Sequence, residues 1–114
     1  MKLAHAIAAG IITLGSAQAW AQCTKPTAPA IPDGSTAEKD AFYAAYQEAK
    51  NYLAEADKYL VCLTEEEKAE MEQGESTEET QAARLDLYNQ TVDEMQALGE
   101  TLNTEVAEFK AREQ

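Results

Sequence analysis

The apolar residues of this chain form a mirror pattern about Gly74. On each side of that glycine they recur at alternating steps of three and four residues, and each one lies as far from Gly74 as its counterpart. The mirrored pairs are Leu63 and Leu85, Leu60 and Tyr88, Ala56 and Val92, Leu53 and Met95, Ala49 and Gly99, Tyr46 and Leu102, and Phe42 and Val106. A heptad stripe is typical of a helix packed along a second helix. The pattern therefore predicts an all-α fold, an antiparallel, coiled-coil-like two-helix hairpin that turns at Gly74.

The predicted hairpin occupies residues 36–114, with helices over about 36–73 and 76–112. Ser35 or Thr36 is a candidate cap for the first helix, and the run from Ser76 to Glu79 has the form of a capping box for the second.

A second capping box, from Thr64 to Glu67, leaves open a break of the first helix after Leu63. We favour a continuous helix, because neither glycine nor proline interrupts residues 36–73. Where Ala49 faces Gly99, the sequence predicts either a close approach of the two backbones or a weak point in the packing.

Residues 1–21 have the features of a secretory signal peptide. The apolar run 3–14 is too short to remain as a membrane-spanning anchor, and Ala19-Trp20-Ala21 is a small-x-small cleavage site. We expect cleavage near Ala21, with residues 17–19 as a second candidate site, and export to the periplasm. The alternative is a lipoprotein anchored at Cys23, which the preceding Gln22 disfavours.

Removal of 21 of the 114 residues would leave 93, and loss of Lys2 would change the formal charge from −12 to −13. So small a chain buries a modest core and usually needs a covalent link. Its strong negative charge argues against nucleic acid or anionic lipid as a partner.

The two cysteines, Cys23 and Cys62, are predicted to form that link, since cysteines of exported proteins usually pair. Pro26, Pro29 and Pro32 recur every third residue, which favours an extended polyproline II segment over residues 22–35. Such a segment would span roughly 40 Å from residue 23 to 36, and a helix roughly 39 Å from residue 36 to 62, so the segment can return along the first helix to Cys62. An intermolecular disulfide and a disordered, tethered leader remain the alternatives.

The first helix carries a ridge on which this segment can pack. Ala45, Tyr52 and Tyr59 are spaced one heptad apart beside the apolar stripe, and Cys62 continues the ridge. On the second helix we expect Leu87 and Leu98 to border the same groove.

The run from Cys23 to Gly34, of the form C-x-x-P-x-x-P-x-I-P-D-G, and the later Tyr59-Leu60-x-Cys62-Leu63 resemble a group of small exported proteins of Gram-negative bacteria. The C-terminal run from Phe109 to Arg112 is similar too. The resemblance covers most of the chain after residue 21. It implies export and the disulfide, and it implies no activity, substrate or binding residue.

Residues 64–80 carry eight glutamates against one lysine. The apolar stripe stops over this stretch, so we expect an acidic, polar tip that is the least stable part of the hairpin. The tip is interpreted either as a solvated end, as a docking surface for a basic partner, or as a loose Ca²⁺ site without the spacing of an EF-hand loop. We favour docking over metal binding, because the glutamates are expected to spread around the helix. The candidate docking residues are Glu65, Glu66, Glu67, Glu70, Glu75, Glu78 and Glu79.

Nothing in the sequence favours catalysis. The only histidine is His5, and the serines after residue 21, Ser35 and Ser76, lie at predicted helix caps with no evident base nearby. We find no metal-ligand or cofactor motif and expect neither. The chain is thus predicted to be a small, exported, non-enzymatic structural or interaction protein of the bacterial envelope, a monomer or homodimer with an unknown protein partner. The alternative is an acidic cation-binding protein that buffers Ca²⁺ or acts under stress.

Overall fold

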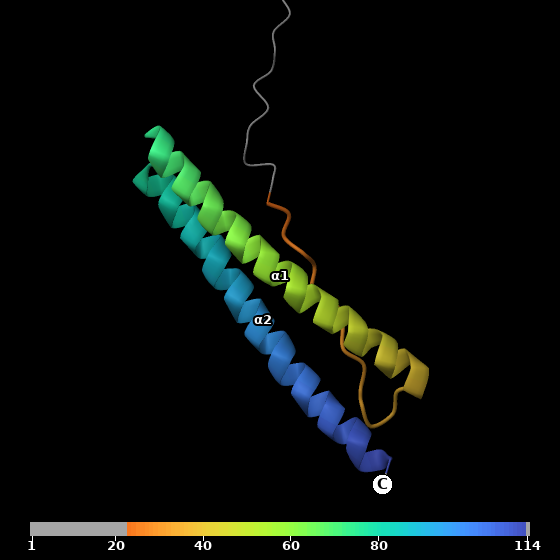
Figure 1. Ribbon diagram of the computed structural model, residues 1–114. Helices are drawn as coiled ribbons and strands as arrows, with labels where there is room; N and C mark the ends of the chain where they lie inside the picture. Colours follow the sequence, from red (N-terminus) through yellow and green to blue (C-terminus); the bar gives the residue numbers. More distant parts are fainter. Residues whose placement is uncertain (1–22, 114) are drawn as a thin grey trace, which may run out of the picture.

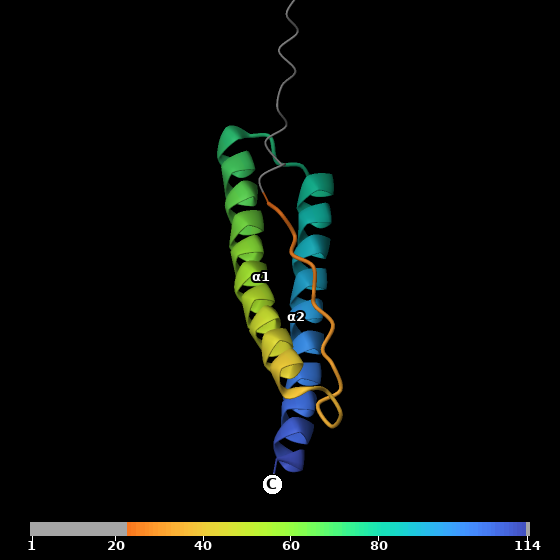
Figure 2. The same cartoon turned by 90° about the vertical axis from the view of Figure 1, so that its right-hand side faces the viewer.

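The computed structural model describes residues 23–113 and contains two long helices. Helix α1 spans Lys39–Gln73, and helix α2 spans Glu78–Arg112. The helices lie side by side and antiparallel, and residues 23–38 run back along the groove between them (Figures 1 and 2). The predicted all-α hairpin is confirmed, whereas the predicted signal peptide, residues 1–21, lies outside the described residues. No helix in the described chain has the length and apolarity that a membrane span requires.

Helix α1 is continuous through Thr64, as expected. The Thr64 hydroxyl donates to the Leu60 carbonyl at 3.0 Å, so it bonds within the helix and does not cap a new one. The start of α1 differs from the prediction, because the N-cap is Glu38. Ser35 does not cap the helix, since its backbone N–H and its hydroxyl both donate to the Asp33 carboxylate, at 2.8 and 2.5 Å. These bonds hold the chain in a turn before α1 begins.

The connection between the helices is built from residues 74–77. Gly74 ends α1 in the left-handed conformation, with φ of 71°, which glycine adopts without steric cost. The capping box of α2 pairs Thr77 with Thr80, each backbone N–H donating to the other's hydroxyl. The expected box from Ser76 to Glu79 is therefore wrong by one residue, and α2 begins two residues later than predicted.

This later start shifts the pairing of the helices. The ring of Phe42 stacks on Phe109 with centroids 4.4 Å apart, where the mirror about Gly74 predicts Val106. At the other end Glu67 contacts Arg84, again three positions beyond its mirror partner. The centre of the hairpin lies between residues 75 and 76, not at Gly74. Because paired residues are equally far from the centre, each partner moves along α2 by twice the shift of the centre. The predicted register is thus wrong by about one helical turn at both ends.

The core is composed of residues from all three segments. Its buried members are Ala49, Tyr52, Ala56, Leu98 and Leu102, and Ile31, Tyr46, Leu53, Met95 and Val106 pack against them. The mirror pattern predicts that Leu85 and Tyr88 of α2 are buried. This prediction was wrong, because they remain 58% and 37% exposed. A Cβ at Gly99 would meet no atom within 4 Å, so neither backbone approaches closely there.

The N-terminal segment packs against both helices rather than α1 alone. Its three prolines are half-buried. The Lys25 ammonium lies 2.9 Å from the Glu94 carboxylate of α2, and the Tyr52 hydroxyl donates to the same carboxylate at 3.4 Å. Because the segment covers them, Tyr52 and Tyr59 are only 4% and 5% exposed. They belong to the core, not to a flank of it.

Near its C-terminal end the segment approaches α2 at Gly34. A Cβ at this position would lie 1.9 Å from the Glu105 carbonyl oxygen, and the Gly34 N–H donates to the Glu105 carboxylate at 2.7 Å. Only glycine allows this contact.

Leu102 and Leu85 distinguish the observed packing from the mirror pattern. The mirror pattern buries both residues, whereas the structure buries only Leu102. Leu102→Ala should lower the free energy of unfolding by about 2–4 kcal/mol, because the side chain leaves a cavity in the core. Leu85→Ala should change it by less than about 0.5 kcal/mol, because the side chain is largely in solvent. Urea denaturation monitored by circular dichroism measures both. Equal losses would contradict the observed register.

Lys25 and Tyr52 make stability depend on pH in the alkaline range. The hydrogen bond to Glu94 raises the pKa of Lys25 above its ordinary 10.5, and burial, followed by the charge of Glu94, raises the pKa of Tyr52 above 10.0. Both groups hold their protons more tightly in the folded state. Their contribution to stability is therefore complete below pH 10 and declines as the pH rises through the raised values. The melting temperature of the native sequence should fall more between pH 9 and 11 than that of a Lys25→Met, Tyr52→Phe variant, and parallel curves would refute the effect.

Candidate functional site

A cavity of about 330 Å³ opens at the loop end of the hairpin, next to the point where the N-terminal segment meets α1. We call it the loop-end cavity. One part of its wall is apolar and another carries charged side chains. The lining residues are Cys23, Tyr59, Leu63, Glu66, Glu70, Glu75, Thr80, Ala83, Arg84 and Leu87.

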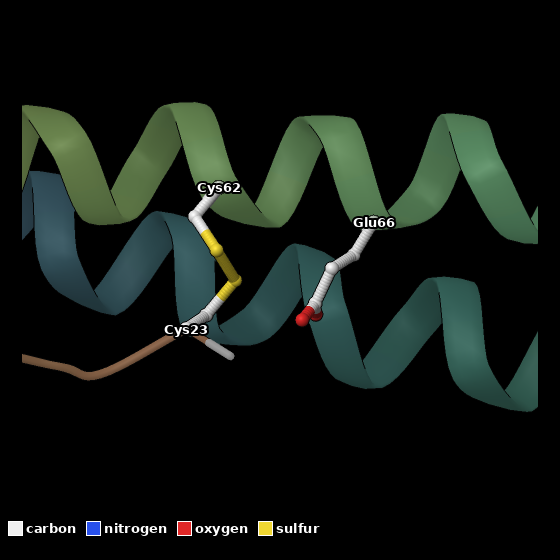
Figure 3. Close-up of side chains that lie close together, drawn as sticks. All are labelled: Cys23, Cys62 and Glu66. Carbon is white, nitrogen blue, oxygen red and sulfur yellow. A yellow bond between two sulfur atoms is a disulfide. The ribbon is translucent and has the colours of Figure 1, made fainter. Parts of the chain in front are cut away.

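The disulfide between Cys23 and Cys62 forms one edge of this cavity and confirms the predicted intramolecular pairing. The two Cα atoms lie 5.7 Å apart and the bond closes a sequence separation of 39 residues. Glu66 follows Cys62 by one helical turn and projects from the same side of α1 (Figure 3). Its carboxylate lies within 4.8 Å of the two sulfurs, which are bonded to each other and so offer no thiolate to a metal.

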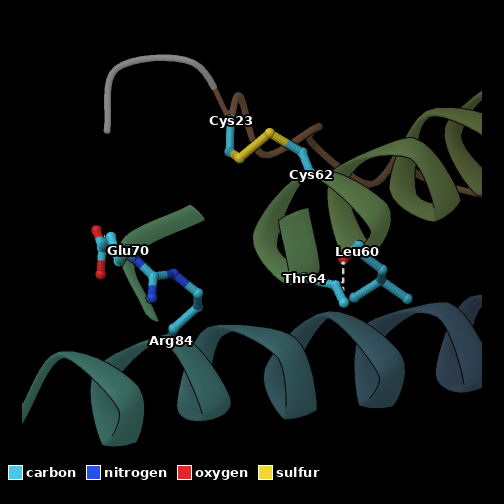
Figure 4. Close-up of a disulfide and its surroundings, with 6 residues drawn as sticks. All are labelled: Cys23, Leu60, Cys62, Thr64, Glu70 and Arg84. Atoms are coloured by element: carbon cyan, nitrogen blue, oxygen red, sulfur yellow. Dashed lines mark hydrogen bonds and ion pairs between the residues drawn. A yellow bond between two sulfur atoms is a disulfide. The ribbon is translucent and has the colours of Figure 1, made fainter. Parts of the chain in front are cut away.

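Arg84 of α2 crosses to the end of α1 and pairs with two of the predicted docking residues. One guanidinium nitrogen contacts Glu67, and another lies 2.8 Å from a carboxylate oxygen of Glu70 (Figure 4). The Arg84 side chain is 13% exposed. Burial works against its charge, but the hydrogen bonds to Glu70 and Glu67 and the negative charges of these two residues together outweigh burial and raise the pKa of Arg84. The pairing therefore ties the loop end of the two helices together through a largely buried cation.

Two carboxylate oxygens of this cluster have no hydrogen-bond donor. Oε1 of Glu66 and Oε2 of Glu70 are both buried, and no donor within the described residues reaches either of them. Glu67 and Glu70 thus converge on Arg84, whereas Glu66 and Glu70 line the cavity. The expectation that the glutamates spread around the helix without converging was wrong for Glu67 and Glu70.

The remaining predicted docking residues lie outside this cluster. Glu65, Glu78 and Glu79 are exposed, as is Glu75 at the rim of the cavity. Sequence reasoning missed Arg84 because this residue follows the acidic run 64–80. The three-residue shift in pairing, which places Arg84 opposite Glu67, was also not foreseen.

A second hollow of about 380 Å³, the apolar groove, lies beside the first. Leu63 and Arg84 line both hollows and so stand between them. The other lining residues are Thr64, Glu67, Met71, Gln81, Leu85 and Tyr88. Met71 is 60% exposed. The groove therefore presents apolar surface to solvent within the most acidic part of the chain.

Asp33, Glu105 and Glu108 form a further carboxylate cluster, at the opposite end of the hairpin. Their oxygens lie within 4.8 Å of one another. Hydrogen bonds from Ser35 lower the pKa of Asp33, and the negative charge of Glu105 raises the pKa of Glu108. One Glu105 oxygen already accepts from Gly34, and Asp33 serves the turn before α1. We interpret these carboxylates as part of the packing of the N-terminal segment.

Comparison of the chain with protein-family models, with curated proteins and with solved structures found no match. The site is therefore interpreted from its own geometry.

Reduction of the disulfide tests how far the loop end depends on it. Opening a loop of this length should cost roughly 4 kcal/mol of stability, mainly by freeing the unfolded chain. Most of the helical signal should persist in the reduced protein, because the contacts of α1 with α2 do not require the bond. Amide exchange should become faster around residues 23–29 and in the wall of the loop-end cavity. A loss of helicity in step with reduction would show instead that the hairpin cannot form without the bond.

Proposed function

We propose that this protein is a small, exported, non-enzymatic interaction protein of the bacterial envelope, and that the loop end of its hairpin binds a basic, amphipathic segment of a partner protein. The observation that carries the proposal is the apolar groove. Leu85, Tyr88 and Met71 are exposed there beside an acidic run whose charges exceed the available cations.

Charge complementarity supports the choice of partner. Residues 64–80 hold eight glutamates and one lysine, and Arg84 neutralises part of this charge. Such a surface attracts a cationic segment and repels an acidic one, while the apolar groove accepts its nonpolar side chains. Acidity for solubility alone would not need exposed leucine, tyrosine and methionine in the same place.

Export is supported by the disulfide, which persists in oxidising compartments, by the features of residues 1–21, and by the resemblance to small exported proteins. A non-enzymatic role is supported by the bonding of the serines in the described chain. Ser76 donates to Glu67 and accepts from Gln81, and Ser35 belongs to the turn at Asp33.

Site-specific photo-crosslinking in the native envelope tests the proposal. A photoreactive residue at position 88 should capture a partner through a lysine- or arginine-rich segment, whereas one at position 43, at the other end of the hairpin, should not. A synthetic peptide of the captured segment should then bind the purified protein, with affinity that falls as salt is added.

Two variants separate the groove from general acidity. Leu85→Ser with Tyr88→Ser should abolish peptide binding, while Val61→Ser, at a residue 57% exposed that lines neither hollow, should leave it unchanged. Glu65→Gln with Glu72→Gln and Glu78→Gln should weaken binding, and the matched set Glu48→Gln, Glu55→Gln and Glu100→Gln should not. Capture of an acidic segment, or equal effects of the two sets, would rule out this docking mode.

A further inference from the structure

The loop-end cavity combines features of a ligand site that partner docking does not use. Its volume of about 330 Å³ is within the range of small-molecule pockets. It lies on the other side of Leu63 and Arg84 from the apolar groove. We propose that it binds a small amphipathic amine, a single primary ammonium group on a short apolar chain.

The charged part of the wall defines the head group. The lining carries the carboxylates of Glu66, Glu70 and Glu75 against the single guanidinium of Arg84, so its net charge is negative. Arg84 donates one hydrogen bond to Glu67 and one to a single oxygen of Glu70. Among residues 23–113, no donor reaches the other Glu70 oxygen or one buried oxygen of Glu66, which is costly for an ionised carboxylate. An ammonium group brings three donors and a positive charge, which suit a wall with more carboxylates than cations.

The apolar part of the wall defines the body of the ligand. Tyr59, Leu63 and Leu87 face the cavity together with the Cys23 end of the disulfide. A short alkyl chain loses contact with water against these groups, with a gain for each methylene buried. This wall also argues against Ca²⁺, which requires six to eight oxygen ligands.

The proposal is independent of partner docking, because the amine binds in a different hollow and the test uses the purified protein without a partner. Hexylamine is a suitable probe, titrated into the isotopically labelled, disulfide-bonded protein at constant ionic strength and neutral pH. Heteronuclear NMR should show saturable shifts, with contacts from the hexyl chain to the methyl groups of Leu63 and Leu87. Hexanol lacks the charge, and ammonium chloride lacks the chain. Each should need at least about tenfold higher concentration than hexylamine to produce the same shifts.

Matched variants locate the head group. Glu66→Gln and Glu70→Gln should each weaken hexylamine binding by about tenfold or more, because each removes a charged acceptor. Glu65→Gln, at the exposed neighbouring position on α1, should leave it unchanged. Spectra of the empty variants verify that the fold is kept, and Glu66→Gln should raise the melting temperature of the empty protein because it relieves an unpaired charge.

Several outcomes would overturn the proposal. One is equal loss of binding in the Glu65 and Glu66 variants, which indicates general attraction of cations. A second is a response to hexanol equal to that of hexylamine, and a third is saturation of the same residues by Ca²⁺ at lower concentration than hexylamine. A fourth is binding of a doubly capped lysine without binding of hexylamine, which would assign the cavity to a partner's side chain.

Discussion

Two helices packed together can bury only a narrow stripe of each, and this limit shapes the whole protein. The groove on one side of the α1–α2 contact would leave Tyr52 and Tyr59 in water. Residues 23–38 lie in that groove and cover them, so the core contains three segments where a plain hairpin has two. The disulfide fixes one end of this cover to α1, and the close approach of Gly34 to Glu105 fixes the other to α2. These two attachments hold the segment over the two tyrosines.

The candidate site lies beyond the stretch of the groove that residues 23–38 cover. Within the described chain this segment begins at Cys23, bonded to Cys62, and α1 continues for eleven residues beyond that point to Gln73. Over this length the described segment no longer covers the groove, and the loop-end cavity opens there. Arg84 holds the helix ends together by ion pairs rather than by apolar packing. Both hollows therefore lie beyond the stretch of the helices that residues 23–38 cover.

The sequence predicted the architecture well because its main determinants are local and periodic. Heptad spacing identified two helices, the proline repeat identified the extended segment, and two cysteines allowed one intramolecular pair. The predicted register was wrong because it depends on the conformation of residues 74–77. There the N-cap of α2 is Thr77 and not the expected Ser76. The predicted burial of Leu85 and Tyr88 was wrong for the same reason, and because the pattern could not show which face of α2 the N-terminal segment would cover.

The candidate site was only half visible in the sequence. Charge counting found the glutamates, since composition alone reveals an acidic run. It could not find Arg84, whose role comes from its position opposite Glu67 after a three-residue shift in register. Nor could it separate glutamates that face solvent from those at a cavity, because Glu65 and Glu66 are neighbours with different surroundings.

The placement of charge at the loop end argues for binding over solubility. A carboxylate that only keeps a protein soluble is best left in water, where its hydration is complete. At the loop end, Glu66 and Glu70 instead hold one oxygen each away from water, and no donor in the described part of the chain reaches either oxygen. The two residues are one helical turn apart, where like charges repel. The same end leaves Leu85 and Tyr88 exposed beside this charge. Both features lower the stability of the isolated protein, and both are relieved by a cationic, partly apolar ligand or partner. Because unsatisfied groups of both kinds lie within a few helical turns, we infer that the loop end is the part of this protein that binds.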